Sequence, residues 1–352
     1  MSVSQTKSFN LPWHQYDQYW ISVSAKGGGL PVALMQTLKS AGMQLSGNTM
    51  QLEADRRWKK PWDAIYEQLL KGKMAGDVQV AVTPGHAPDD KTIDWKSAVS
   101  IQNIADSLWL GDALIEDRIL CYLQPVVSSR DKVFGYESFA RVEAEDGNVI
   151  GGDKIIMASR ALNIEYMIDR HLHVQAITTF VCSDFDGFLF VNLFPSFIHR
   201  PEGYLGGLSD AAKSFGIISK HVVLDFTGSE SPRDVMHLRN ICEYGKSRGY
   251  SVALDDIASL EGAKKLVPDI RPDFVKLDMK LTSEVEDAGK RETISRIVEL
   301  VHGVGGTVIA EGVETELMYQ TLKSLGVDLF QGYYFSPPVP VETVVNRSTG
   351  TS

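Results

Sequence analysis

From Arg118 onward, short apolar runs alternate with amphipathic stretches along the chain. Helical periodicity marks residues 233–249, 291–303 and 315–326, between apolar runs rich in β-branched and aromatic residues. Near-continuous apolar strands that alternate with helices are typical of a parallel sheet covered by helices, and eight such strands predict closure into a TIM-like (β/α)8 barrel. The eight predicted strands span residues 119–127, 133–142, 188–194, 221–227, 250–256, 273–278, 306–312 and 329–335.

The first two of these strands break the alternation. Only "SSRDK" separates them, which is too short for a crossover helix. We therefore expect them to form an antiparallel hairpin, so that the first strand of the barrel runs against the others.

The first ~110 residues have a different pattern, with strands over 19–25 and 77–84 and a helix over 59–72. A polar turn cluster at 85–92 precedes an amphipathic helix over 97–110. The sequence thus predicts a small α/β N-terminal domain over 1–110, a barrel over 115–343 and a flexible tail over 344–352. We find no catalytic motif in the N-terminal domain, which leaves a sensory or interaction role.

Composition narrows the class of protein. Of the 352 residues, 43% are hydrophobic, as expected for a globular core, and the net charge of −10 argues against general binding of DNA or RNA. Three widely spaced cysteines indicate buried thiols in a reducing compartment. No apolar run has the length of a signal peptide or a membrane span, so we expect a cytoplasmic protein.

Polar residues stand at the predicted strand ends, which converge on one mouth of a TIM-type barrel. Several acids brought together there require cations, and oxygen ligands without histidine or cysteine favour Mg²⁺ or Mn²⁺ over zinc. The "HLH" segment, His171–His173, lacks the i,i+4 spacing of a helical metal site and predicts a pair on a helix surface. The strand-end residues are Glu137, Arg141, Asn192, Asp225, Asp255, Asp256, Lys276, Asp278, Glu311 and Gln331.

These residues lie within motifs that resemble EAL domains, which are bacterial cyclic-di-GMP phosphodiesterases with a TIM-like barrel. The motifs are "YLQPVV", "GYESFAR", "VNLFP", "LDFTGSE", "ALDDIAS", "VKLD", "VIAEGVET" and "QGYYFSPP". The resemblance implies binding of c-di-GMP, two divalent cations, Mg or Mn, and hydrolysis to linear pGpG in signalling that controls biofilm formation and motility. It also implies a homodimer. From the pattern of the N-terminal domain we expect a protein partner there, and from the net charge and the apolar runs we expect no DNA partner and no membrane span.

The resemblance also implies a role for each residue. Lys276 and Glu311 would position or deprotonate the attacking water, and Gln331 would support that network. The implied metal ligands are Glu137, Asn192, Asp225, Asp255 and Asp256, and the implied substrate contacts are Gln124, Phe139, Arg141 and Asp278.

The chain departs from the family pattern at four places. The signature "EAL" is "ESF" here, Asp225 stands where the family has Glu, and Gly228 replaces another Glu. The loop after the fifth strand, residues 257–261, has lost its two glycines and with them the easily reached positive-φ conformations. Three hypotheses stay open: a phosphodiesterase with reduced activity, a catalytically silent c-di-GMP receptor, and a scaffold that acts through protein–protein interaction.

Overall fold

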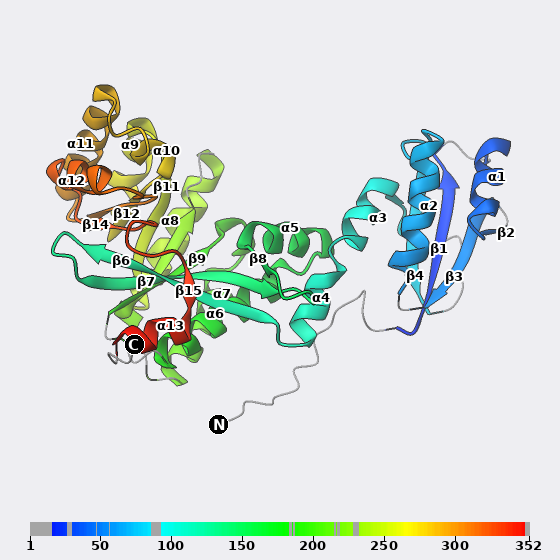
Figure 1. The fold of residues 1–352 in the computed structure, drawn as a ribbon, viewed down its shortest axis with the longest axis horizontal. Helices are drawn as coiled ribbons and strands as arrows, with labels where there is room; N and C mark the ends of the chain where they lie inside the picture. Colours follow the sequence, from blue (N-terminus) through cyan, green and yellow to red (C-terminus); the bar gives the residue numbers. More distant parts are fainter. Residues whose placement is uncertain are drawn as a thin grey trace. The chain divides into compact units, whose positions relative to one another are not determined.

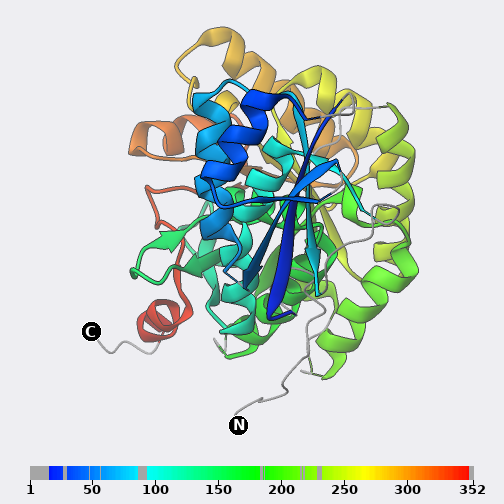
Figure 2. The same cartoon turned by 90° about the vertical axis from the view of Figure 1, so that its right-hand side faces the viewer.

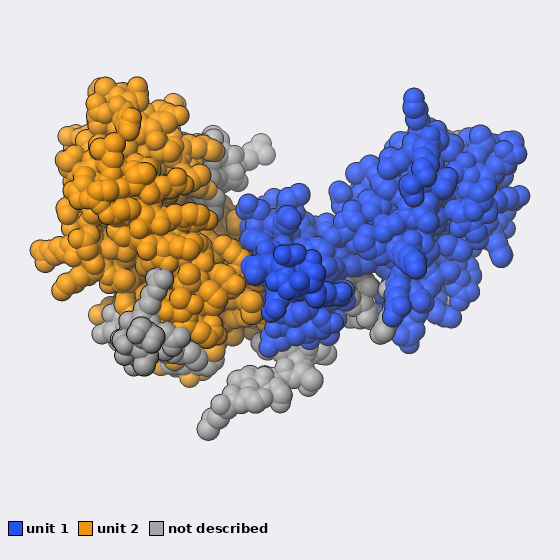
Figure 3. Space-filling view, viewed as in Figure 1, with its two compact units in different colours: residues 1–119, 142–165 blue, residues 120–141, 166–352 orange. Residues whose placement is uncertain are grey.

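We describe the protein from a computed structural model. It divides into two compact units, coloured separately in Figure 3: residues 1–119 with 142–165, and residues 120–141 with 166–352. The first unit therefore includes residues 142–165, which the sequence assigned to the barrel. The described residues are 16–26, 30–46, 48–55, 57–85, 93–182, 185, 187–214, 216, 219–227 and 232–348.

An antiparallel sheet in the order β2-β3-β1-β4-β5 forms the first unit's framework. Alternation along β1 buries Tyr19, Ile21 and Val23 completely, and helix α2 contributes the buried Trp62 and Ile65. The strands are β1 (Gln18–Ala25), β2 (Gln44–Ser46), β3 (Thr49–Asp55), β4 (Val78–Pro84) and β5 (Lys96–Ser97). The helices are α1 (Val32–Ser40), α2 (Lys59–Lys71), α3 (Ala98–Ala105), α4 (Leu108–Ile115) and α5 (Gly152–Leu162).

The second unit is a closed barrel, and Figure 1 labels its strands and the helices around them. Its strands follow the order β6-β14-β13-β12-β11-β10-β9-β7, and the pairing of β6 with β7 closes the ring. Strands β7 and β9 to β14 run parallel, whereas β6 is antiparallel to β14, which confirms the predicted barrel and its reversed first strand. The strands are β6 (Ile119–Ser128), β7 (Val133–Glu143), β9 (Phe188–Leu193), β10 (Val222–Thr227), β11 (Ser251–Ile257), β12 (Phe274–Leu277), β13 (Thr307–Ala310) and β14 (Leu329–Phe330). The short β15 (Val339–Pro340) pairs with β6, and the short β8 (Val149–Ile150), which belongs to the first unit, pairs with Val142 and Glu143.

Helices cover the outside of the barrel, and Figure 2 shows those of residues 200–300 in green to orange. Outward-facing strand residues such as Leu224 and Leu254 pack with the helical residues Leu238 and Val267 in one apolar core. The α-helices are α6 (Glu165–Cys182), α7 (Pro201–Ser214), α8 (Pro232–Ser247), α9 (Leu260–Ile270), α10 (Met279–Thr282), α11 (Ala288–Gly303), α12 (Glu316–Ser324) and α13 (Val341–Ser348), with 3-10 turns η1 (Pro195–Phe197) and η2 (Ser219–His221).

A second apolar cluster fills the inside of the barrel. It takes one residue from each of seven strands, so it forms a packed layer rather than a pore. The buried residues of this cluster are Val126, Phe190, Val223, Ala253, Phe274, Ile309 and Leu329.

Three local predictions need correction or completion. The helix expected over 97–110 is two helices, because the chain turns at Asp106 and Ser107 before α4 begins. Strands β2 and β3 were not predicted, and helix α13 reaches Ser348, inside the segment expected to be a flexible tail. The polar cluster at 85–92 lies, apart from Gly85, outside the described residues. Within the described residues, no helix combines the length and apolar character that crossing a membrane requires.

Candidate active site at the barrel mouth

The polar residues of the mouth form a layer directly above the inner apolar cluster. Side chains on one face of a strand recur every second residue, so the residue two positions beyond each inner apolar residue also faces the barrel interior. On β6, which runs in the opposite direction, the equivalent position lies two residues earlier, at Gln124. This spacing places Asn192, Asp225, Asp255, Lys276, Glu311 and Gln331 in one layer with Gln124.

Lys276 lies at the centre of this layer and is completely buried. Its ammonium group forms ion pairs with carboxylates from four other strands or strand ends. Four carboxylates from across the ring thereby surround one nitrogen. The distances from Nζ are 2.7 Å to Glu311, 2.9 Å to Glu137, 2.9 Å to Asp225 and 3.3 Å to Asp255.

One side of the mouth is a hydrogen-bonded group of amides around Glu137. The Asn192 amide nitrogen donates to Oε1 of Glu137 at 2.8 Å, and Gln331 donates to Oε2 at 2.9 Å. Gln331 also donates to Oε1 of Gln124 at 3.1 Å, while Gln124 donates to the Ser336 carbonyl at 3.0 Å. Both oxygens of Glu137, and both the oxygen and the nitrogen of the Gln124 amide, therefore have hydrogen-bond partners within the protein.

The opposite side of the mouth is a group of three acids. Carboxylate oxygens of Asp255, Asp256 and Glu311 all lie within 4.8 Å of one another. A register shift in β11 and a left-handed backbone at Asp256, with φ 57°, turn this second aspartate toward the first. The Asp256 backbone N–H donates to Oδ1 of Asp255 at 2.8 Å.

The charges of the mouth do not balance, since five carboxylates surround one ammonium. Burial, with further contributions from Asp255 and Glu137, raises the pKa of Asp225 and of Glu311 well above the usual range, although Lys276 opposes the shift. Burial alone would lower the pKa of Lys276, but the four carboxylates raise it well above its ordinary value.

The acid group fits a hard divalent cation. All of its donors are oxygens, and one oxygen of the completely buried Asp225, Oδ1, has no hydrogen-bond partner within the described residues. In the part of the chain that the structure describes, the Asn192 side chain forms hydrogen bonds through its amide nitrogen alone, which leaves its side-chain carbonyl oxygen as a potential ligand. Asp255, Asp256 and Glu311 are the carboxylates best placed to hold such an ion.

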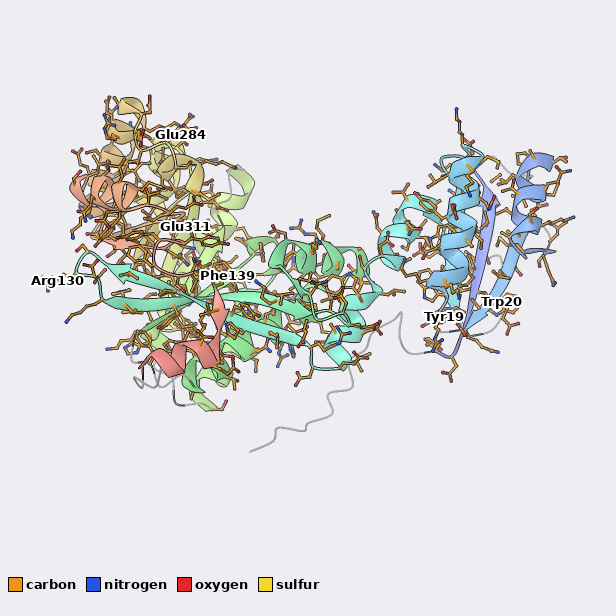
Figure 4. The ribbon with its side chains drawn as sticks, in the orientation of Figure 1. Tyr19, Trp20, Arg130, Phe139, Glu284 and Glu311 are labelled. Carbon is orange, nitrogen blue, oxygen red and sulfur yellow. The ribbon has the colours of Figure 1, made fainter. Side chains whose placement is uncertain are left out.

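At the rim, Arg141 lies between two aromatic rings, 5.6 Å from the Phe139 centroid and 5.7 Å from that of Tyr122. Figure 4 labels Phe139 and Glu311 in the barrel unit. Asp278 is engaged locally, because its side chain accepts a hydrogen bond from the Lys280 N–H as the N-cap of α10.

The loop that follows β11 is short and fixed at both ends. Ile257 is 3% exposed and pairs with Leu277, and Ser259 caps α9 by accepting a hydrogen bond from the Gly262 N–H at 3.1 Å. The family's glycines would have allowed more backbone conformations here. Gly228, the other altered position, lies outside the described residues.

Sequence reasoning missed three residues next to the site. Thr282 is buried and donates to the Glu311 carbonyl at 2.6 Å, and Tyr122 flanks Arg141. The prediction that His173 lies on a helix surface is wrong: it is 5% exposed and contacts Asn192. The apolar residues next to these positions in the sequence indicate burial. They do not reveal the contacts, because each contact joins segments far apart in the sequence.

Residues 108–338 match the family model described as "EAL domain". The chain belongs to the EAL domain family. Among curated relatives, the EAL-domain containing protein YkuI of Bacillus subtilis (strain 168) is 24% identical over 235 residues, or 66% of this chain and 57% of YkuI. The chain therefore spans little more than half of that relative's length.

Solved EAL structures share the fold. The PaMucR phosphodiesterase in its c-di-GMP complex is 24% identical with a TM-score of 0.61, covering 68% of this chain and 99% of that one. A standalone versatile EAL protein from Vibrio cholerae O395, in a c-di-GMP bound form, is 28% identical with a TM-score of 0.56, covering 63% and 93%.

Proposed function

We propose that the barrel mouth binds c-di-GMP and, with Mg²⁺ or Mn²⁺ bound, hydrolyses one phosphodiester bond to give linear pGpG. EAL relatives are described as phosphodiesterases and as c-di-GMP complexes, which supports this substrate. The activity would serve bacterial second-messenger signalling in the cytoplasm. A homodimer, and a protein partner for the N-terminal region, are further expectations of this proposal.

The observation that carries the proposal is the group of Asp255, Asp256 and Glu311 beside Lys276. A layer that served only packing would not place three carboxylates within 4.8 Å of one another and leave them short of positive charge. Such an excess of negative charge favours cation binding, and a phosphodiester anion then becomes a favourable ligand of the cation-loaded mouth.

Each residue has a defined task in this proposal. Bound divalent cations would lower the pKa of a water and stabilise charge that develops on the phosphate. Arg141, held between two rings, would place its guanidinium on a phosphate oxygen. Lys276 holds Glu311 at 2.7 Å, so that this carboxylate can orient the attacking water and accept its proton.

The remaining predicted site residues also have roles in this proposal. Glu137, Asn192 and Asp225 would complete the metal ligands, and Gln331 would hold Glu137. Phe139 offers an apolar face to a guanine base. Gln124 and Asp278 would meet the dinucleotide through local rearrangement, since their side chains are bonded within the protein.

A second candidate is a receptor that binds c-di-GMP without turnover. The anchored loop at Ile257 and Ser259 favours it, because a catalytic loop that cannot adjust loses rate while the binding surface persists. Asp225 favours the receptor too. Its side chain is shorter than the family's Glu, is completely buried, and is paired with the Lys276 ammonium at 2.9 Å.

Product analysis of c-di-GMP with purified protein in Mn²⁺ tests the proposal. We expect slow formation of pGpG and an increase in the double variant Asp225→Glu with Gly228→Glu, which restores the family residues. Binding without hydrolysis in both proteins would favour the receptor. If c-di-GMP does not bind either with or without metal, the proposal is contradicted. The hypothesis of a scaffold that acts through protein–protein interaction would then be left.

A further inference from the structure

His173 lies behind the strand that carries Asn192. It is on helix α6, 5% exposed, and its Nε2 is 3.0 Å from the backbone carbonyl oxygen of Asn192. The contact joins the outer helical layer to Asn192. In the mouth, the side-chain amide nitrogen of Asn192 donates to Glu137 and to the Ser138 carbonyl.

The contact with Asn192 determines which nitrogen of the ring donates to that carbonyl. A carbonyl oxygen can only accept, so Nε2 of His173 carries the proton and donates to Asn192. In the neutral ring, Nδ1 is then an acceptor, and the Tyr204 hydroxyl lies 3.3 Å from it as the donor. Both ring nitrogens are therefore engaged, and the ring cannot rotate without losing both bonds.

Asp169 lies one helical turn before His173 and holds the ring from the same helix. Its Oδ1 is 3.6 Å from Nε2, and both side chains are buried. Burying polar side chains costs free energy unless they interact with one another. A rearrangement of the Asp169–His173–Tyr204 group would lose these interactions, so the group resists it.

We infer that His173, held by Asp169 and Tyr204, is a positioning residue that fixes the Asn192 backbone and thereby aims the Asn192 side chain at the mouth. The inference rests on the proposed function of Asn192 as a metal ligand. Hydrogen-bonding partners behind metal ligands typically change metal affinity by about 10–100-fold when removed.

Three variants of the 352-residue chain test the inference. His173→Phe keeps a ring but removes the donor, and His173→Gln keeps a donor. His237→Phe is the matched control, because His237 also contacts a backbone carbonyl after β9, at 3.1 Å, but that of Pro195 and not that of Asn192. The readouts are the Asn192 side-chain amide signal in a ¹H–¹⁵N spectrum, assigned with Asn192→Asp, and the affinity for Mn²⁺.

We expect His173→Phe to move the Asn192 amide signal and weaken Mn²⁺ binding by about 10–100-fold, with His173→Gln restoring both. His237→Phe should leave both unchanged. An unmoved Asn192 signal in His173→Phe, or equal effects from His237→Phe, would overturn the inference.

The two claims fail separately. If the wild type binds no Mn²⁺, the proposed function falls, while the amide signal still decides whether His173 positions Asn192. If His173→Phe does not fold, as judged by circular dichroism, Tyr204→Phe takes its place, because it removes the bond that sets the ring. A signal at the wild-type position in Tyr204→Phe would then overturn the inference.

Discussion

The two sides of the barrel mouth differ in how their polar groups are satisfied. On one side, Glu137 accepts hydrogen bonds from Asn192 and Gln331, so its oxygens are used within the protein. On the other side, Asp255, Asp256 and Glu311 lie close together, and Lys276 is the ammonium that pairs with two of them, Asp255 and Glu311. The comparison shows that the carboxylate of one side is satisfied by amide donors, whereas carboxylates outnumber ammonium groups on the other side, where we propose a cation.

Lys276 connects the two sides, so its removal should have the largest effect. We expect Lys276→Met to lower the free energy of unfolding by about 3–5 kcal/mol, because buried carboxylates lose their shared ammonium. The loss should shrink at low pH, where protonated carboxyls need no cation. Urea unfolding measures it, with the exposed Lys280→Met as control; equal stability of the two variants would contradict the shared role of Lys276.

Gly332 supports the amide side through a close backbone contact. A Cβ at this position would collide with the Val313 backbone, whose N–H donates to the Gln331 carbonyl at 3.0 Å. We expect Gly332→Ala to cost about 1–3 kcal/mol in urea unfolding. Gly303→Ala, where nothing lies within 4 Å of the added carbon, is the control and should be close to neutral.

The acid side should make stability depend on pH. The pKa values of Asp225 and Glu311 are raised on folding, so the folded chain binds protons more tightly than the unfolded one. Their contribution to stability is therefore present at low pH and lost as pH rises above about 4, toward the raised pKa values.

Urea unfolding between pH 5 and 8 in EDTA checks this dependence. Wild type should lose stability relative to Asp225→Asn as pH rises, and Mg²⁺ should reduce that loss. A difference between the two proteins that stays constant across this range would argue against a charged, unbalanced mouth.

Asp256 should give the smallest effect, because its side chain is the most exposed of the three acids. Burial and the neighbouring Asp255 raise its pKa, so neutralising it should relieve repulsion. We expect Asp256→Asn to raise the melting temperature slightly in EDTA and to reduce the stabilisation by Mg²⁺. Thermal unfolding in both buffers measures the two shifts; a lower melting temperature in EDTA would contradict the account.

Alternation along the strands made most of the mouth predictable. Once the eight apolar runs are recognised, every second residue faces inward, which places Asn192, Asp225 and Lys276 in one layer. The position of a residue at a strand end does not reveal which residues its side chain contacts. That Gln124 bonds Gln331 and that His173 lies behind Asn192 depend on contacts between segments far apart in the sequence.

Binding of Mn²⁺ to the metal-free protein, followed by electron paramagnetic resonance, tests the difference between the two sides most directly. We predict at least one Mn²⁺ bound per chain, with affinity at least about tenfold weaker in Asp255→Asn and unchanged in the exposed control Asp269→Asn. No bound Mn²⁺ in the wild type, or equal affinity in Asp255→Asn, would contradict the claim that the acid side of the mouth is a cation site.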